Sequence, residues 1–283
     1  MAGTKSIDIG GYGFRPNKRL GQHFLRDRSV IQQIINRAGF EKSDHIMEIG
    51  PGLGALTIPL AGLVQRITAI EKDSQLTDIL GEKLSGSGVT NVTLINEDIL
   101  RLDLKGLRKG SAKKIKVIGN LPYNISSPFL EKLINHRDLI SMAVLMFQYE
   151  FARRLLSTPG GKEYGAITVL TRYNAAVSQL IEVSKEAFYP RPKVGSMVLS
   201  IDMERPYPER ARDELNLKRV VKGAFAHRRK TVLNSLKGAL PSSRGDEISA
   251  ALKRCGIDPK RRAETIDIDE FLSLASELNP GPL

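Results

Sequence analysis

The sequence predicts an α/β protein with a doubly wound, mostly parallel sheet and a small all-helical C-terminal domain. Three observations predict it: short apolar runs of strand length in the first half of the chain, intervals between them that can hold crossover helices, and no strand-like run after residue 205. Strands buried on both faces of a parallel sheet are apolar in this way. The runs are Ile46–Ile49, Ile67–Ile70, Val92–Ile95, Ile115–Ile118 and Met142–Phe147.

A helix is expected ahead of the sheet, at Arg28–Ala38. Asp27 precedes it as an N-cap residue, Gly39 follows it, and its apolar residues recur every three or four positions. The Gly-rich segment of about 15 residues before Pro16 is expected to be a flexible leader.

Beyond the fifth strand the pattern changes. A helix is expected around Ala166–Ala175, and two further strand-like runs, Gln179–Val183 and Ser196–Ile201, flank a proline-rich loop. These two strands are expected to close the sheet as an antiparallel edge. Prolines at 206 and 208 mark a linker, so we expect one domain over residues 1–205 and a helical, RNA-binding domain over residues 206–283.

The composition narrows the class of protein. The chain has 283 residues, and 43 Lys and Arg against 31 Asp and Glu leave a net charge of +12, which is typical of proteins that bind a polyanion. Its one cysteine excludes an intramolecular disulfide and agrees with a reducing cytoplasm, and its four histidines lack the spacing of a metal site. No apolar run reaches the ~18 residues of a membrane span. We therefore expect a cytoplasmic protein with no metal.

A glycine-rich turn follows the first strand. Gly50, Gly52 and Gly54 stand between that strand and a helix, where doubly wound sheets bind nucleotides. Glu71 closes the second strand, 21 residues after Gly50, and a carboxylate there can accept from both hydroxyls of a ribose. Asp98 closes the third strand, in position to accept from an adenine amine. A tight structural turn is the alternative, but the acids at successive strand ends favour a cofactor site.

The spacing of the glycines selects among nucleotide cofactors. G-x-G-x-G lacks the third glycine that the dinucleotide fingerprint requires. S-adenosylmethionine has no pyrophosphate to hold, so this turn suits it better than a nicotinamide dinucleotide.

The fourth strand ends in Asn120-Leu121-Pro122-Tyr123. An exocyclic base amine is a poor nucleophile because its lone pair is delocalised into the ring, and it needs acceptors that hold its hydrogens out of plane. Asn120 offers a side-chain carbonyl, the backbone of Leu121 or Pro122 offers a second, and Tyr123 offers a ring on which a base can stack. Pro122 stiffens the turn. The tetrapeptide indicates an amino-methyltransferase that acts on nucleic acid.

Several motifs taken in order resemble the KsgA family, the S-adenosylmethionine-dependent small-subunit ribosomal RNA adenine N6-dimethyltransferases. The resemblance covers nearly the whole chain, through KRLGQHFL from Lys18, EIGPGLGALT from Glu48, NLPYNISSPF from Asn120, FYPRPKVGSMV from Phe188 and FAHRRKT from Phe225. It implies dimethylation at N6 of two adjacent adenines in a hairpin loop near the 3′ end of 16S ribosomal RNA, during small-subunit biogenesis. It also implies a monomer whose partner is that RNA or an immature 30S particle.

The resemblance assigns roles to particular residues. The implied cofactor-binding residues are His23, Leu25, Gly50, Glu71, Asp98, Ile99 and Asn120, and the implied catalytic residues are Asn120, Leu121, Pro122, Tyr123 and Phe188. Phe188 would approach the target adenine opposite Tyr123, although a core aromatic is the alternative for it. Many family members carry Asn where this chain has His23, so a backbone contact with the cofactor is the safer expectation there.

Basic clusters predict the RNA contacts. His227, Arg228, Arg229 and Lys230 are expected to open a helix of the small domain, and Lys18 with Arg19 forms a second group; Lys260, Arg261 and Arg262 form a third. Solvated surface charge is the alternative for each. Three other functions stay open: a large-subunit ribosomal RNA adenine methylase of the macrolide-resistance type, a DNA adenine methylase, and a ribosome-assembly factor that acts mainly by binding immature small subunits.

Overall fold

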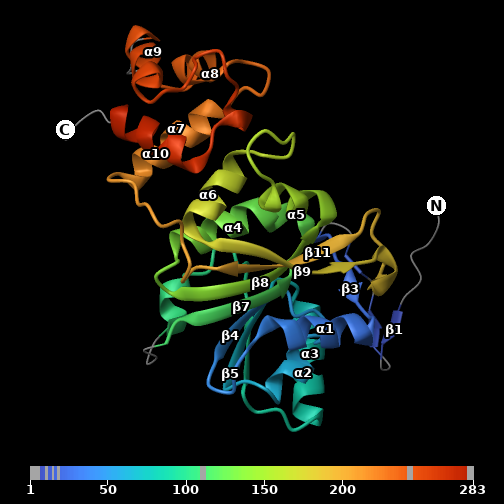
Figure 1. The fold of residues 1–283 in the computed structure, drawn as a ribbon. Coiled ribbons are helices and arrows are strands. Elements are labelled where there is room, and N and C mark those ends of the chain that lie inside the picture. The colour runs from blue at the N-terminus through green and yellow to red at the C-terminus, as the bar shows by residue number, and fades with distance from the viewer. Residues whose placement is uncertain are drawn as a thin grey trace. The chain divides into compact units, whose positions relative to one another are not determined.

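The chain divides into two compact units. The computed structural model describes residues 7–9, 12–14, 16–17, 20–108, 113–240 and 245–278. The first unit comprises Met1–Ala152 and Ser178–Glu204, and the second comprises Arg153–Val177 and Arg205–Leu283 (Figure 1). The second unit thus also takes residues 153–177, which the sequence analysis assigns to the first domain.

A seven-stranded sheet forms the centre of the first unit. Its order is β6 (Val92–Asn96), β5 (Arg66–Glu71), β4 (His45–Ile49), β7 (Ile115–Asn120), β8 (Ile140–Gln148), β11 (Ser196–Asp202) and β9 (Ala176–Val183). The pairs from β6 to β8 are parallel, as the apolar runs predict. β11 is antiparallel to β8, and β9 lies at the edge beside β11, which confirms the predicted closure of the sheet.

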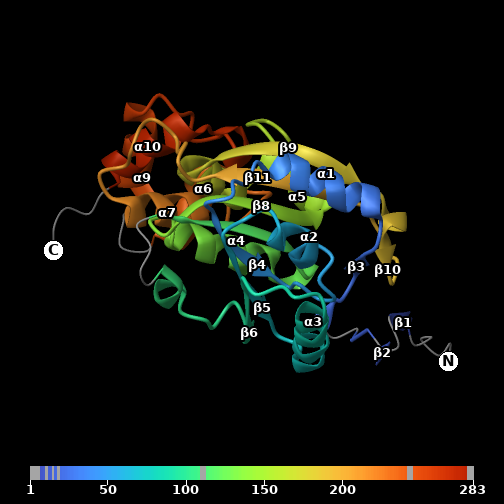
Figure 2. The same cartoon turned by 90° about the horizontal axis from the view of Figure 1, so that it is seen from below.

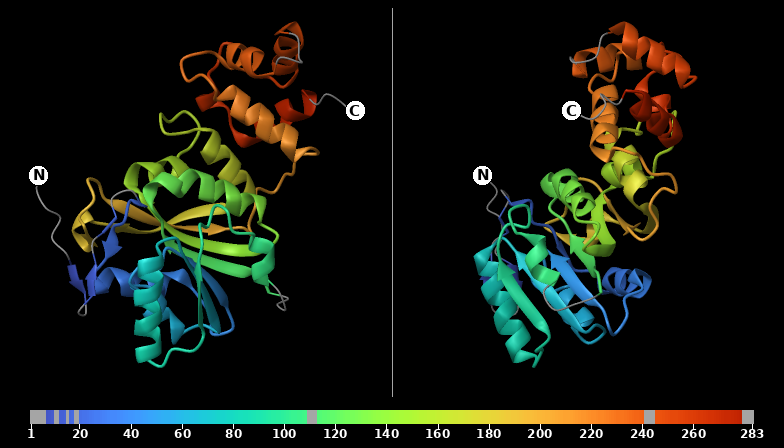
Figure 3. Two further views of the ribbon diagram at one scale, coloured as in Figure 1. Left: turned by 180° about the vertical axis from the view of Figure 1, so that it is seen from behind. Right: turned by 90° about the vertical axis from the view of Figure 1, so that its left-hand side faces the viewer.

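Helices cover both faces of this sheet. α1 (Arg28–Ala38) has the predicted bounds because the Asp27 side chain accepts from the N–H groups of Ser29 and Val30 and because Gly39 is left-handed with φ 64°. α1 and α2 (Thr57–Ala61) share one hydrophobic core with the sheet. α3 (Ser74–Gly86) packs on the same face, since a Cβ at Gly81 would contact Leu94 of β6, which packs against the core of α1 and α2. The left view of Figure 3 shows α3, in teal, and α1, in blue, on one side of the sheet and the green helix α4 (Ser126–Asn135) on the other. α4 follows the short 3-10 helix η3 (Tyr123–Ile125), and η2 (Leu104–Arg108) precedes β7.

Two small two-stranded sheets lie outside the seven-stranded sheet. β1 (Ile7–Ile9) and β2 (Tyr12–Phe14) pair antiparallel, so the expectation of a wholly flexible leader is wrong for these residues. β3 (Phe24–Leu25) pairs antiparallel with β10 (Phe188–Tyr189), which follows the 3-10 helix η4 (Lys185–Ala187) (Figure 2). The N-terminal segment is therefore attached to the proline-rich loop.

The second unit is helical. α5 (Tyr149–Leu156) spans the division between the units; α6 (Ala166–Asn174), α7 (Glu214–Ala224), α8 (Val232–Ala239), α9 (Gly245–Arg254), the 3-10 helix η5 (Ala263–Thr265) and α10 (Ile268–Glu277) complete the unit. Val169 and Tyr173 of α6 are buried in the same core as Leu236 and Phe271. This shared apolar core is the reason that residues 153–177 group with the C-terminal helices.

One sequence prediction fails in this unit. The basic stretch from His227 to Lys230 does not open a helix but lies in the connection between α7 and α8. The reason is the cap: the Thr231 side chain accepts from the N–H of Asn234, so α8 begins only after Thr231. The four basic residues are exposed in that connection.

Candidate active site

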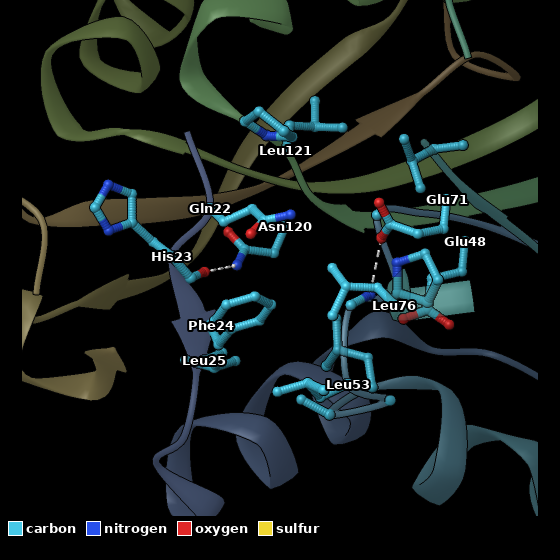
Figure 4. A pocket seen from close by; sticks show the side chains of 18 of the residues that line it. Gln22, His23, Phe24, Leu25, Glu48, Leu53, Glu71, Leu76, Asn120 and Leu121 are labelled. Atoms are coloured by element: carbon cyan, nitrogen blue, oxygen red, sulfur yellow. Dashed lines mark hydrogen bonds between the residues drawn. The ribbon is translucent and has the colours of Figure 1, made fainter. Parts of the chain in front are cut away.

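A pocket of about 890 Å³ lies in the first unit at the carboxyl ends of the parallel strands. Gly50 after β4, Glu71 at the end of β5, Asp98 after β6 and Asn120 at the end of β7 all line it, and so do the predicted His23, Leu25, Ile99, Leu121, Pro122 and Tyr123. Figure 4 shows side chains from the N-terminal segment and from the strand ends meeting around one space. The sheet topology thus brings these predicted residues together.

Glu71 fixes the glycine-rich loop. Its Oε2 accepts from the N–H of Gly52 at 3.1 Å, and its Oε1 accepts from the N–H of Asp73 at 3.0 Å. Gly50 and Gly52 are left-handed, with φ 65° and 57°, so glycine suits both positions. Burial raises the pKa of Glu71, while the two N–H groups act against that shift. A carboxylate has about four lone-pair directions, so each oxygen can still accept from a ligand hydroxyl.

Asp98 lines the same pocket as Glu71. Its Oδ2 accepts from Lys72 Nζ at 2.9 Å, and its Oδ1 accepts from the N–H of Leu100 at 2.9 Å. The hydrogen bond from Lys72 is the main reason that the pKa of Asp98 lies below its usual value. Ile99, 5% exposed, supplies an apolar surface beside the carboxylate. Asp98 therefore stays an ionised acceptor suited to an amine.

Asn120 has a defined amide orientation. Its Nδ2 donates to the backbone carbonyl of His23 at 2.8 Å (Figure 4), and its Oδ1 accepts no hydrogen bond from the described residues. Gly119, one position earlier, lets β7 approach β4, because a Cβ at Gly119 would lie only 2.8 Å from the carbonyl oxygen of Ile49. Oδ1 is thus the amide atom that remains for a ligand donor.

The rest of the NLPY turn is equally fixed. The Leu121 side chain is 2% exposed and packs in the interior. Pro122 has an extended backbone, with φ −53° and ψ 130°. The Tyr123 hydroxyl lies 2.9 Å from Ser196 Oγ, and burial raises its pKa. Tyr123 is therefore a neutral, anchored ring at the pocket.

The N-terminal segment closes one side of the pocket. Gln22 Nε2 donates to Asp73 Oδ2 at 2.7 Å, and the ring of Phe24 lies against the loop, where a Cβ at Gly52 would come within 3.2 Å of it. Phe24 and Leu76 form a small core with Leu53 and Ile79. The sequence prediction includes His23 and Leu25 of this segment but not the apolar wall that Phe24 forms.

Phe188 does not line the pocket. It is 4% exposed and belongs to the core between α1 and the sheet, because its pairing with Leu25 turns it toward that core. The structure therefore does not bring Phe188 together with Tyr123 around a common space, and the core alternative describes its position.

Glu48 is a pocket residue that sequence reasoning did not single out. It is 1% exposed, lines the pocket from within β4, and its Oε2 has no hydrogen-bond partner among the described residues. Burial raises its pKa to about 7, with Thr57 acting against the shift and the charge of Glu71 adding to it. A glutamate inside the otherwise apolar run Ile46–Ile49 is the signal that could have found it. An unpartnered buried acceptor of this kind suits a cationic ligand group.

This raised pKa makes stability depend on pH. The folded protein binds a proton at Glu48 more tightly than the unfolded chain, so this contribution is full below pH ~4.5 and is lost as pH rises through about 7. In Glu48→Gln that titration is absent. We expect the unfolding free energy of the ligand-free protein, relative to Glu48→Gln, to fall by about 3 kcal/mol between pH 4 and 8. Urea unfolding of both proteins across that range measures it, and a constant difference would contradict it.

The predicted RNA-binding residues differ in their contacts within the protein. In the second unit, all four residues from His227 to Lys230 are exposed, and Arg228 also donates to the carbonyl oxygen of Lys162 at 2.5 Å. Arg261 pairs with Glu270 at 2.5 Å, which makes it a structural contact. Lys18 and Arg19 lie outside the described residues. The exposed cations of the α7–α8 connection are thus the stronger candidates for phosphate contacts.

The described part of the chain holds neither a membrane-spanning helix nor a cluster of metal-binding side chains. No helix there is long and apolar enough to cross a membrane. Likewise, no group of three or more His, Cys, Asp or Glu side chains within those residues is placed to hold a metal ion.

Comparisons with known proteins point to one family. The family model described as ribosomal RNA adenine dimethylase matches residues 13–280. The chain is 43% identical over 261 residues to the ribosomal RNA small subunit methyltransferase A of Desulforapulum autotrophicum, with 92% of this chain and 91% of that protein covered. It is 44% identical over 270 residues to the protein of the same name from Geobacter sulfurreducens, covering 95% and 97%.

Two solved structures share the fold over most of the chain. A dimethyladenosine transferase from Plasmodium falciparum matches with TM-score 0.75 and 27% identity, covering 90% of this chain and 97% of that one. The 23S rRNA methyltransferase ErmE matches with TM-score 0.67 and 26% identity, covering 90% and 99%. With the family model spanning most of its length and curated relatives above 40% identity, the chain belongs to the ribosomal RNA adenine dimethylase family.

Proposed function

We propose that this protein transfers methyl groups from S-adenosylmethionine to N6 of adenine in small-subunit ribosomal RNA and produces N6,N6-dimethyladenine. The observation that carries the proposal is Asn120, whose Nδ2 is held by the His23 carbonyl so that Oδ1 is left for a base amine at the pocket. Membership of the adenine dimethylase family supports the same reaction. The target we propose is a pair of adjacent adenines in a hairpin loop near the 3′ end of 16S RNA.

The residues of the pocket suit the cofactor. Glu71 would hold the ribose hydroxyls, Asp98 with Ile99 the adenine ring, Gly50 with the backbone of His23 and Leu25 the methionine end, and Asn120 the region of the transferable methyl. The unpartnered Glu48 carboxyl suits the ammonium of the amino acid. When bound, S-adenosylmethionine supplies an electrophilic methyl group on a sulfonium centre.

The chain's own residues then position the amine. In the first transfer, Asn120 Oδ1 and the carbonyl of Leu121 or Pro122 accept the two N6 hydrogens out of the base plane, which localises the lone pair on the nitrogen. Tyr123 stacks on the base, which must leave its RNA stack at a cost of a few kcal/mol, least in a loop. The methylated nitrogen becomes acidic, so water takes its proton. Catalysis therefore rests on orientation and on fixed dipoles rather than on a strong base.

The second unit would bind the RNA backbone. The exposed Arg229 and Lys230, with His227, form a basic connection between α7 and α8, and Arg228 fastens that connection to the loop at Lys162. An immature 30S particle in the cytoplasm, bound by one copy of the protein, is the partner that we propose. Relatives named as small-subunit methyltransferases support this choice over large-subunit RNA.

Replacing both Arg229 and Lys230 with alanine should weaken RNA binding and lower the slope of log K against log salt by about 1.4 to 1.8, because each phosphate contact contributes ~0.7 to 0.9. Cofactor affinity should not change, because the pocket lies in the first unit. Filter binding across a salt titration measures the slope. The matched control is Arg212→Ala with Lys253→Ala, two exposed cations of the same unit. An equal loss of slope in both double variants would contradict a specific role for the connection.

One experiment tests the proposed function. The protein is incubated with labelled S-adenosylmethionine and, in parallel, with unmethylated small-subunit particles, naked small-subunit RNA and large-subunit RNA. Label in dimethyladenine of the small subunit alone is the expected result. Label only in large-subunit RNA would overturn the proposal in favour of the macrolide-resistance type.

A further inference from the structure

His23 contacts both the NLPY turn, which lines the pocket, and the proline-rich loop. Its Nδ1 lies 2.6 Å from the carbonyl oxygen of Pro190, in the proline-rich loop, and its own carbonyl accepts from Asn120 Nδ2 at 2.8 Å. Its ring lies against the ring of Tyr123, with centroids 5.8 Å apart and planes inclined by 27°. One residue therefore connects the N-terminal segment that carries β3, the NLPY turn and the proline-rich loop.

The chemistry of these contacts fixes the state of the imidazole. The Pro190 carbonyl can only accept, so Nδ1 must carry the hydrogen and donate it. That bond sets the orientation of the ring, and the ring in turn lies over one face of Tyr123. Tyr123 is held at its far end by Ser196. The aromatic ring is thus restrained both along its length and on one face.

We propose that His23 is a positioning residue for the target adenine: its ring and its Nδ1–H hold Tyr123 and the Pro190 loop in place, so that the base meets Asn120 Oδ1 and the Tyr123 ring at once. The inference rests on the proposed function. It assigns a role to the side chain of His23, separate from the contact made by its backbone carbonyl.

The N-terminal segment does not depend on the His23 side chain for its attachment. Gln22 bonds to Asp73, the N–H of Arg26 donates to the carbonyl of Ala187 at 2.8 Å, and β3 pairs with β10. Loss of the imidazole therefore leaves the segment anchored on both sides of position 23. Changes in His23 variants report on positioning rather than on unfolding of the segment.

Three variants separate the two contacts. His23→Phe keeps a ring for Tyr123 and loses the donor to Pro190, His23→Asn keeps an N–H near the place of Nδ1 and loses the ring, and His23→Ala loses both. Losing one neutral hydrogen bond or one aromatic pair that positions a reacting group is expected to lower the rate by a few-fold. We expect kcat on saturating RNA to fall roughly tenfold in His23→Ala and roughly threefold in each of the others. His136→Ala, which removes an imidazole bonded to the Lys132 carbonyl, is the control expected to keep full activity.

A second readout does not require methyl transfer. RNA with 2-aminopurine in place of the target adenine is bound in the presence of S-adenosylhomocysteine, and its fluorescence reports stacking of the base in the pocket. The wild-type protein should quench it, Tyr123→Ala should not, and His23→Ala should quench it only in part. The affinity for S-adenosylhomocysteine, measured by calorimetry, should stay within twofold in all His23 variants.

The possible outcomes separate a failure of the role of His23 from a failure of the proposed function. Unchanged kcat and unchanged quenching in His23→Ala would overturn the inference, and so would a loss of cofactor affinity as large as the loss of turnover, since the side chain would then act on the cofactor. A wild-type protein that does not methylate the RNA at all would instead sink the proposed function. The two failures are therefore distinguishable.

Discussion

Replacing Asn120 with alanine should lower the rate of methyl transfer by between about 10²-fold and 10³-fold, the range measured when one preorganised polar contact of a reacting group is removed. The carbonyl Oδ1 is the acceptor that the structure leaves for the base amine, since Nδ2 is engaged with the His23 carbonyl. Single-turnover transfer from labelled S-adenosylmethionine, at saturating cofactor and RNA, measures the loss.

Two further variants sharpen this result. Asn120→Asp keeps an acceptor of the same shape but loses the Nδ2 donor to His23, so its rate should lie between those of the wild type and the alanine variant. Asn135→Ala, an exposed asparagine at the end of α4, should be as active as the wild type. RNA binding by Asn120→Ala should be retained, and an assembly role that persists in that variant would support the binding view of the protein. A rate within threefold of the wild type would refute the role of Oδ1.

Replacing Glu71 with alanine should weaken S-adenosylhomocysteine binding by about 10³-fold. Two ribose hydroxyls donating to a charged acceptor contribute ~1.5 to 3 kcal/mol each, and every ~1.4 kcal/mol is tenfold in affinity. The same change leaves the N–H groups of Gly52 and Asp73 without their acceptor, so the loop that holds the cofactor loosens as well. Isothermal titration calorimetry measures the affinity directly.

Glu71→Gln separates the two contributions. Its amide oxygen still accepts one N–H and its shape is nearly that of the wild type, so its affinity should fall by only about tenfold to thirtyfold. Glu82→Ala, an exposed residue of α3 outside the pocket, controls for the change in net charge. If Glu71→Ala bound the cofactor as tightly as Glu82→Ala, the assignment of the ribose to this carboxylate would be wrong.

Local rules predicted the parts of the fold that depend on neighbouring residues. Asp27 and Gly39 give both ends of α1 because a cap and a left-handed glycine act within one turn of the helix. The pocket was predictable because topology places the carboxyl ends of β4, β5, β6 and β7 side by side, wherever the helices between them pack. Strand ends therefore located Gly50, Glu71, Asp98 and Asn120.

The sequence predictions that the structure corrects depend on tertiary contacts. Phe188 is in the core because β10 pairs with β3, a pairing of two residues that no sequence pattern announces. Residues 153–177 join the helical unit because Val169 and Tyr173 pack on Leu236 and Phe271, far along the chain. Glu48 lies within β4 and not at its end, so the rule that points to strand ends does not find it, although it lines the pocket.

Gly119 has a consequence for how this enzyme could be altered. It does not line the pocket, yet the space for its missing side chain is what allows β7 to lie so near the Ile49 carbonyl with Asn120 as the next residue. Any mutational library restricted to residues that touch the ligands would leave position 119 untested. The position of the Asn120 side-chain amide thus depends on the spacing between the backbones of β7 and β4. Designs that graft NLPY onto another sheet would need to copy that spacing as well.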